Sequence, residues 1–142
     1  MKTMGHFLAD NKRLIYSVRP DATVREALEL MAQKNIGALL VLDGETLAGV
    51  FSERDYARKV ILKGRTSSEA LVQDIMTAKV ITVESAHTID HCMQVMTEHH
   101  IRHLPIMDKQ HVKGLISIGD VVKEMMAHQK SIIEQLHRYI AG

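Results

Sequence analysis

The sequence has 142 residues, enough for one domain or for two small half-domains that share a core. Its formal net charge of +1 gives no reason to expect binding to nucleic acid, a membrane surface or acidic substrates. The single cysteine, Cys92, cannot form an intrachain disulfide, and no apolar run approaches the length of a membrane span. The N-terminal lead-in, residues 1–13, is interrupted by the polar run 10–13, so we expect no secretory signal and a cytoplasmic protein.

From residue 14 the chain reads as strand, helix, strand, strand and helix. Residues 15–18 form a short β-branched strand, and residues 23–35 form a helix with apolar residues on one face. Thr23, followed three residues later by Glu26, predicts a capping box at the start of that helix. Two strands joined by the turn "DGET" and a second helix, "ERDYARKVIL", complete repeat 1, residues 14–64.

Residues 65–79 form a polar linker whose one apolar patch we expect to pack briefly across the module, and the same order of elements then returns in repeat 2, residues 80–127. A shift of 65 residues aligns 15–60 with 80–125 without a gap. Nine positions are identical, among them the glycine, serine and aspartate of a motif considered below. One such unit is small for independent stability. We therefore predict a mixed α/β (α+β) fold in which two β-α-β-β-α repeats pack pseudo-symmetrically and share one core.

Residues 128–142 are predicted to form a C-terminal helix. Ile132, Ile133, Leu136 and Ile140 recur at helical spacing, which makes one side of this helix apolar. A free helix would expose that stripe. We therefore expect it to lie on the module or on a second subunit.

Each repeat contains glycine, two apolar residues, serine, two variable residues and aspartate, as "GVFSERD" at 49–55 and "GLISIGD" at 114–120. Serine followed three residues later by aspartate is a helix-capping signature, so both motifs have a purely structural explanation. The same junction presents free backbone N–H groups to an anion, and its carboxylate suits a ribose diol. The glycines would let another backbone or a ligand come close.

A phosphate at such a site needs basic partners, and the two repeats offer different ones. Repeat 2 has Arg102 and His103 on its middle strand, and repeat 1 has Arg54 and Arg58 in and after its motif. An arginine on an otherwise apolar strand needs a carboxylate or a ligand as partner, and both explanations stay open for Arg102. For Arg58, a solvated helix face is the simpler explanation.

Catalysis and metal binding have weaker support. His87 and His91 are four residues apart, a spacing that metal sites use, and Cys92 directly follows His91, but neither H-E-x-x-H nor C-x-x-C is present. Ser52 and Ser117 do not lie in a G-x-S-x-G elbow. We expect no catalytic residues and no metal site.

The doubled pattern, with "IGALLVLDGETLAGVFSERD" and "IRHLPIMDKQHVKGLISIGD", resembles a tandem pair of CBS (cystathionine-β-synthase) domains, a Bateman module, over about residues 14–127. Repeat 1 departs from this pattern by having Leu40 where repeat 2 has Pro105. The resemblance implies binding of AMP, ADP or ATP, and in some members NAD(H) or S-adenosylmethionine, with no cofactor required. It implies that the aspartates hold ribose, the serines ribose or phosphate, the Arg-His pair phosphate, and certain strand residues the adenine. The implied ligand-binding residues are Val18, Ser52, Arg54, Asp55, Arg58, Ile81, Val83, Arg102, His103, Ser117 and Asp120.

The leading hypothesis is therefore a regulatory sensor and not an enzyme, with adenine nucleotides bound in two unequal clefts and a signal passed to an unknown partner protein. The resemblance also implies a homodimer, and neither nucleic acid nor a membrane is expected as a partner. One alternative is a structural or interaction module whose clefts stay empty. Another is a metal- or thiol-dependent protein that uses the histidines of repeat 2.

Overall fold

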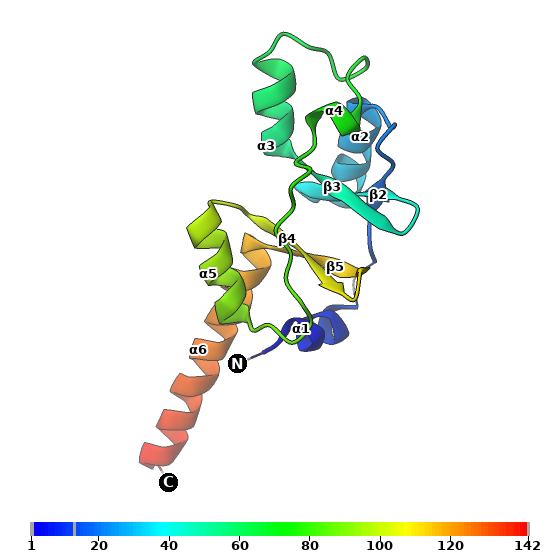
Figure 1. The fold of residues 1–142 in the computed structure, drawn as a ribbon. Coiled ribbons are helices and arrows are strands. Elements are labelled where there is room, and N and C mark those ends of the chain that lie inside the picture. The colour runs from blue at the N-terminus through cyan, green and yellow to red at the C-terminus, as the bar shows by residue number, and fades with distance from the viewer. Residues whose placement is uncertain (1, 13, 142) are drawn as a thin grey trace. The chain divides into compact units, whose positions relative to one another are not determined.

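The computed structural model describes residues 2–12 and 14–141, which form two compact units (Figure 1). The unit that contains most of repeat 1, here the repeat 1 unit, holds residues 14–81 and 109–113. The other, here the repeat 2 unit, holds residues 2–12, 82–108 and 114–141. Helices and small sheets occur in both, which confirms the predicted mixed α and β fold class.

The repeat 1 unit is built on a three-stranded sheet. Its first strand runs parallel to the second, with Ser17 opposite Leu40, and the second and third form an antiparallel hairpin whose turn holds Gly44 at a φ of 62°. A left-handed residue is what a tight hairpin turn requires, and glycine adopts it without strain. The elements are β1 (Ser17–Val18), α2 (Val24–Lys34), β2 (Ala38–Asp43), β3 (Thr46–Ser52), α3 (Glu53–Tyr56), the π-helical turn η1 (Ala57–Ile61) and α4 (Val72–Ile75).

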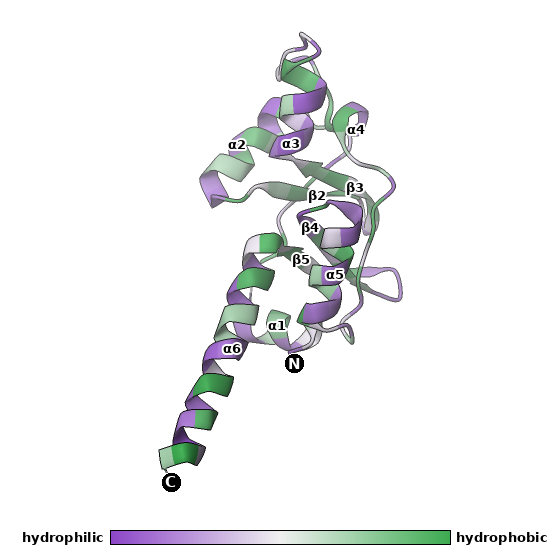
Figure 2. Ribbon diagram, turned by 90° about the vertical axis from the view of Figure 1, so that its left-hand side faces the viewer, coloured by the Kyte–Doolittle hydropathy of each residue, from purple (hydrophilic) through white to green (hydrophobic). Residues whose placement is uncertain are grey.

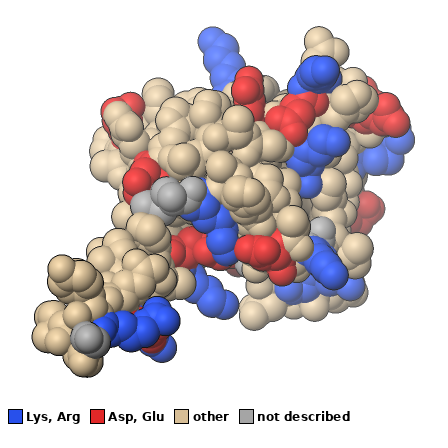
Figure 3. All heavy atoms as spheres, turned by 90° about the horizontal axis from the view of Figure 1, so that it is seen from below, with Lys and Arg blue, Asp and Glu red and all other residues tan. Residues whose placement is uncertain are grey.

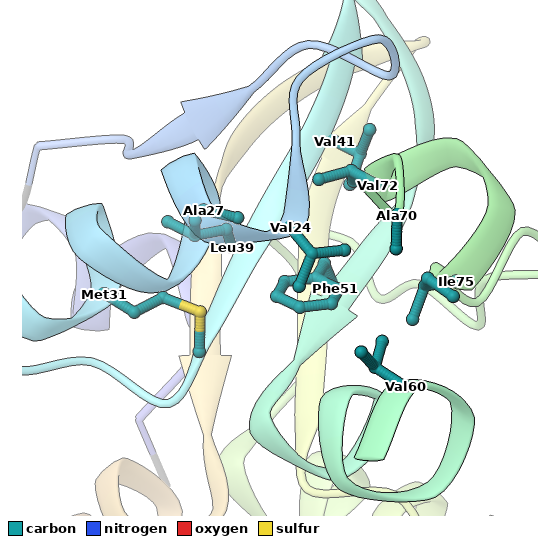
Figure 4. Close-up of a cluster of buried hydrophobic side chains, with 10 residues drawn as sticks. All are labelled: Val24, Ala27, Met31, Leu39, Val41, Phe51, Val60, Ala70, Val72 and Ile75. Atoms are coloured by element: carbon teal, nitrogen blue, oxygen red, sulfur yellow. The ribbon is translucent and has the colours of Figure 1, made fainter. Parts of the chain in front are cut away.

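Ten buried side chains form the core of this unit (Figure 4). The apolar face of α2 packs there because its buried residues recur every three or four positions. The linker also takes part, since Ala70, Val72 and Ile75 are all buried in the same cluster. The full set is Val24, Ala27, Met31, Leu39, Val41, Phe51, Val60, Ala70, Val72 and Ile75.

The repeat 2 unit follows the same plan with one strand fewer. Its elements are α1 (Met4–Asn11), α5 (Ile89–His99), β4 (His103–Asp108), the part of β5 (His111–Ser117) from Gly114 onward, and α6 (Ile118–Ala141). The strand expected over 80–83 is reduced to one parallel bridge between Val83 and Ile106. The equivalent of the Ser17–Leu40 pair would need an N–H from Pro105, which proline lacks, so the pairing cannot extend.

Residues 2–9 and 70–77, here the covering segments, occupy equivalent places on the two units. Within the repeat 2 unit, Met4 N donates to His87 O (2.8 Å) and Ile89 N donates to Lys2 O (3.0 Å). Within the repeat 1 unit, Val72 N donates to Ala22 O and Val24 N to Ala70 O, both at 2.9 Å. The segment that precedes repeat 1 in the sequence therefore covers repeat 2, and the linker covers repeat 1.

The second helix of repeat 2 and the predicted C-terminal helix are one continuous helix, α6, of 24 residues. Figures 1 and 2 show its C-terminal half extending beyond the rest of the repeat 2 unit. The expectation that the apolar stripe lies on the module is not met, because residues 129–141 are all exposed. No helix in the described part of the chain has the length and apolar character needed to cross a membrane.

Candidate functional site

The motif of repeat 1 lies where β3 ends and α3 begins. Ser52 is the N-cap residue, and its hydroxyl accepts a hydrogen bond from Asp55 N (3.2 Å). Asp55 Oδ2 in turn accepts from Ser52 N and from Ser52 Oγ, each at 3.0 Å. This reciprocal capping box satisfies backbone groups that a helix end would otherwise leave unpaired.

Repeat 2 has the same geometry between β5 and α6. Asp120 Oδ2 accepts from Ser117 N and Ser117 Oγ, each at 2.9 Å, and Asp120 N donates to Ser117 Oγ at 3.2 Å. The four residues are half-buried in both repeats, neither sealed in the core nor fully in water. The capping explanation is therefore correct for both motifs, and it fixes both carboxylates in one orientation.

In each repeat, the residue just before the first strand of the hairpin accepts a hydrogen bond from the first residue of the helix that follows the hairpin. Ile118 N donates to Arg102 O (2.8 Å), as Glu53 N donates to Gly37 O (3.1 Å) in repeat 1. The structure therefore brings the backbone of Arg102 to the first turn of α6, next to the motif of the same repeat. The Arg102 side chain is exposed and that of His103 is half-buried.

Lys59, a residue that the sequence reasoning did not select, is the cation at the repeat 1 motif. Its Nζ lies 3.2 Å from Asp55 Oδ1 and donates to Ile75 O at 2.9 Å. Thr77 Oγ1 donates to the same Asp55 oxygen at 3.3 Å. Both oxygens of Asp55 thus have donors within the repeat 1 unit. Lys59 lies one helical turn after Asp55, and that spacing was the available signal.

The equivalent position in repeat 2 carries the opposite charge. Glu124 lies one turn after Asp120 and pairs with Lys2 (3.0 Å), which also pairs with Asp10 (2.8 Å). Hydrogen bonds to Asp10 and then to Glu124 raise the pKa of Lys2, and the bond to Lys2 lowers the pKa of Asp10. The lysine at the repeat 1 motif therefore pairs with the motif aspartate, whereas the lysine of the covering segment in repeat 2 pairs with Glu124, one turn farther along α6.

The two motif glycines leave room for the covering segments to pack closely. A Cβ at Gly49 would lie 2.6 Å from Thr77 O and 2.8 Å from Met76 Sδ, and a Cβ at Gly114 would lie 2.6 Å from Leu8 Cδ2. The close approach predicted for these glycines is observed, and the atoms that approach them belong to the covering segments of the same chain. Leu8 and Met76 are equivalent residues of the two covering segments.

The other predicted ligand-binding residues are spread over several elements. Arg54 lies in α3 and Arg58 in η1, and both are exposed. Val18 in β1 and Ile81 after the linker are half-buried. Val83 is buried in the repeat 2 unit, where its N–H donates to Pro105 O (3.0 Å). Their contact with a nucleotide stays a prediction.

His87 and His91 of repeat 2 are half-buried, whereas the neighbouring Cys92 is buried. The rings of His87 and His91 stack at 4.1 Å, and His87 Nδ1 accepts from Glu84 N (2.9 Å). Cys92 is buried, its thiol donates to Met4 Sδ (3.4 Å), and burial raises its pKa to about 11. Across residues 2–12 and 14–141, no three His, Cys, Asp or Glu side chains are grouped in a way that could hold a metal ion.

Comparison with known proteins gives the family. The family model "CBS domain" matches residues 12–62 and 72–127. The chain is 41% identical to the CBS domain-containing protein CBSX3, mitochondrial, of Arabidopsis thaliana over 127 residues, which cover 86% of this chain and 62% of that protein's length. A solved CBS-domain protein from Burkholderia ambifaria MC40-6 has 50% sequence identity and a TM-score of 0.86, covering 90% of this chain and 96% of its own.

A more distant structure shares the fold. It is the CBS domain pair of protein MJ0100 in complex with 5'-methylthioadenosine and S-adenosyl-L-methionine, with 22% identity and a TM-score of 0.74, covering 82% of this chain and 91% of its own. Two matched regions, two equivalent capping boxes and two equivalent covering segments agree on one conclusion: the chain belongs to the CBS-domain family and carries two CBS repeats.

Proposed function

We propose that this protein is a regulatory module that binds adenine nucleotides, AMP, ADP, ATP or NAD(H), and signals through a partner protein. The observation that carries the proposal is the pair of serine–aspartate capping boxes, each half-buried at the point where a strand meets a helix. A helix N-terminus favours an anion, and a carboxylate held in place can accept from the two hydroxyls of a ribose. The adenosyl ligands bound to the MJ0100 domain pair support this ligand class.

The two sites are proposed to be unequal. In repeat 1, a ribose hydroxyl that donates to Asp55 Oδ1 would share this oxygen with Thr77 and Lys59 or displace one of them. In repeat 2, Arg102 and His103 would hold a mononucleotide phosphate beside Asp120, since the Arg102 backbone lies at the start of α6. Repeat 1 has Gly37 and Ala38 at the equivalent positions, with Arg54 and Arg58 farther along, which suits a longer ligand such as a dinucleotide.

A thermal-shift panel of AMP, ADP, ATP, NAD, NADH and S-adenosylmethionine tests the proposal. A ligand at 100 times its Kd adds roughly 2.7 kcal/mol to the free energy of unfolding, which is a clear rise in Tm. Asp55→Asn and Asp120→Asn, which keep the side-chain size, should each remove one site's response. The exposed Asp74→Asn is the matched control and should leave both responses intact.

The inequality has its own test. Co-crystallisation with AMP and NADH together should place AMP at Asp120 and the dinucleotide at Asp55. AMP at both motifs in the presence of NADH contradicts the unequal sites while leaving the ligand class intact. If no adenosyl ligand at millimolar concentration changes the Tm, the sensor proposal fails and the structural or interaction module with empty sites takes its place.

The output of the proposed sensor is not catalytic. Ligand binding changes an output only if the ligand has different affinities for two states, so the partner protein must prefer one of them. A homodimer, as the family resemblance implies, is part of the proposal. The cytoplasmic location stays a prediction, since the Arabidopsis relative is named as mitochondrial.

A further inference from the structure

The C-terminal half of α6 exposes apolar side chains that the rest of the repeat 2 unit does not cover. Val121, near the start of the helix, is buried, whereas Met126 is 65% exposed, Leu136 55% and Ile140 82%. Apolar bands recur along the helix to its end in Figure 2, and the end of α6 in Figure 3 is covered mainly by uncharged atoms. An apolar strip of this length on a helix already formed is a surface for a partner.

The strip has the spacing of a coiled coil. Its residues are separated alternately by four and three positions, so they lie on one line along the helix. A shallow groove beside this line is lined by Met126, Gln129 and Ile133, and otherwise by the polar residues Lys130, Glu134, His137 and Arg138. In a coiled coil, the spaces between the side chains of such a line receive knobs from a facing helix. The line, here the seam, consists of Val122, Met126, Gln129, Ile133, Leu136 and Ile140.

The residue types in the seam specify two helices. Ile133 and Ile140 occupy one set of seam positions and Leu136 the other, a combination that favours a two-stranded parallel pair. Gln129 is the single polar residue of the seam, and a polar side chain in a coiled-coil interface lowers its stability. The seam spans just under three heptads, from residue 122 to residue 140, which makes a short coiled coil. Packing of its first turns in the repeat 2 unit already orders the helix.

The residues beside the seam favour a parallel over an antiparallel pair of helices. Lys123, Lys130 and His137 follow the seam on one side, and Met125, Ile132 and Tyr139 follow it on the other. An antiparallel pair would bring the cationic sides together, with Lys130 facing its own copy. A parallel pair brings each cationic side against the apolar side of the second helix, where the lysine methylene groups can pack.

A membrane surface is a poorer partner for the same strip. Amphipathic helices that bind anionic lipid carry a polar face rich in lysine and arginine. Residues 129–141 contain Lys130 and Arg138 but also Glu134, so their net charge is small.

From these features we propose that α6 pairs in parallel with α6 of a second copy of this chain through the seam. This proposal is independent of nucleotide binding, because none of the motif residues belongs to the seam. It also differs from dimerisation through other faces of the repeats, since it predicts which residues of the two copies meet.

Disulfide cross-linking of the full chain tests this pairing directly. Gln129→Cys and Ile140→Cys place a thiol in the seam, and Ser131→Cys places one on the outer face as a control. The native Cys92 should not react, because it is buried and its pKa is about 11. Under mild oxidation, both seam variants should form covalent dimers at least five times faster than the control.

A charge in the seam should abolish the cross-link. Ile133→Glu in the Gln129→Cys background should slow the cross-link at least tenfold, whereas Gln135→Glu on the outer face should leave it unchanged. Both positions are exposed, so folding should be unaffected, which circular dichroism can check.

Three outcomes overturn the proposal. The first is no cross-link from Gln129→Cys, or one no faster than that of Ser131→Cys. The second is a cross-link from Gln129→Cys without one from Ile140→Cys, because residue 140 lies beside residue 122 in an antiparallel pair, roughly 27 Å from its own copy. The third is a monomer that sediments with phosphatidylserine vesicles, which would assign the strip to a membrane surface.

Discussion

The two serine–aspartate motifs begin their helices with the same hydrogen bonds and differ one turn later. Asp55 is followed by Lys59, which pairs with it, and Asp120 is followed by Glu124, which pairs with Lys2. The capping geometry is therefore common to both repeats, and the charge around it is specific to each. A duplicated motif can preserve its backbone function while the charges around it change.

The covering segments give the largest expected difference between the repeats. Gly49→Ala should lower the free energy of unfolding by about 3 kcal/mol, because its Cβ meets Thr77 O, a backbone atom that accepts a hydrogen bond from Val50 N. Gly114→Ala should cost less than about 1 kcal/mol, because its Cβ meets the end of the Leu8 side chain, which can rotate. Guanidinium denaturation measures both. Equal costs would mean that the covering segments are held equally rigidly.

A second difference appears in alkaline solution. Cys92 in α5 stands where α2 has Ala27, and burial raises the Cys92 pKa from 9.0 to about 11. The folded state keeps the thiol proton that the unfolded chain releases, so this contribution to stability is present below pH 9 and is lost as the pH rises toward 11. The wild type should lose up to about 2.7 kcal/mol over this range relative to Cys92→Ala. Denaturation of both proteins at pH 8 and pH 11 provides the measurement, and parallel pH profiles would refute it.

The caps should show no difference between the repeats. Ser52→Ala and Ser117→Ala each remove one capping hydroxyl with the same partners, so each should cost about 1 kcal/mol. Ser131→Ala, on the exposed face of α6, is the control and should cost close to nothing. A cap in one repeat that costs more than twice the other would show that the two boxes differ in rigidity despite their equal distances.

The smallest expected effect comes from the ion pair at Asp55. Lys59→Met should cost about 0.5–1 kcal/mol, because the lysine is partly exposed and water screens the pair. Arg58→Met removes the same charge from the neighbouring exposed position and should change stability little. A double-mutant cycle with Asp55→Asn isolates the coupling. Zero coupling would show that Lys59 acts through its bond to Ile75 O alone.

The sequence predicted the elements that rest on local signals. The apolar faces of α2 and α5, the hairpins and the two capping boxes all follow from spacing within a few residues. The 65-residue repeat added the equivalence of the two motifs, which family membership confirms.

Long-range contacts were not predictable in this way. The covering segments are equivalent at an offset of 68 residues, so an ungapped alignment at 65 does not find them. Thr77 reaches Asp55 across 22 positions, and Lys2 reaches Glu124 from the other end of the chain. The short pairing of Val83 depends on the missing N–H of Pro105, whereas the sequence comparison had treated the Leu40/Pro105 difference only as a departure of repeat 1 from the family pattern.

Residues 2–9 cover repeat 2, and residues 70–77 cover repeat 1. The boundaries of the repeats in the sequence are therefore not the boundaries of the two compact units. A cut between residues 79 and 80 would separate repeat 2 from residues 2–9, which supply the buried side chains of Met4 and Phe7 to its unit. No single cleavage of the chain yields both units with all their parts. The segment that is repeated in the sequence and the set of segments that builds one compact unit are therefore different.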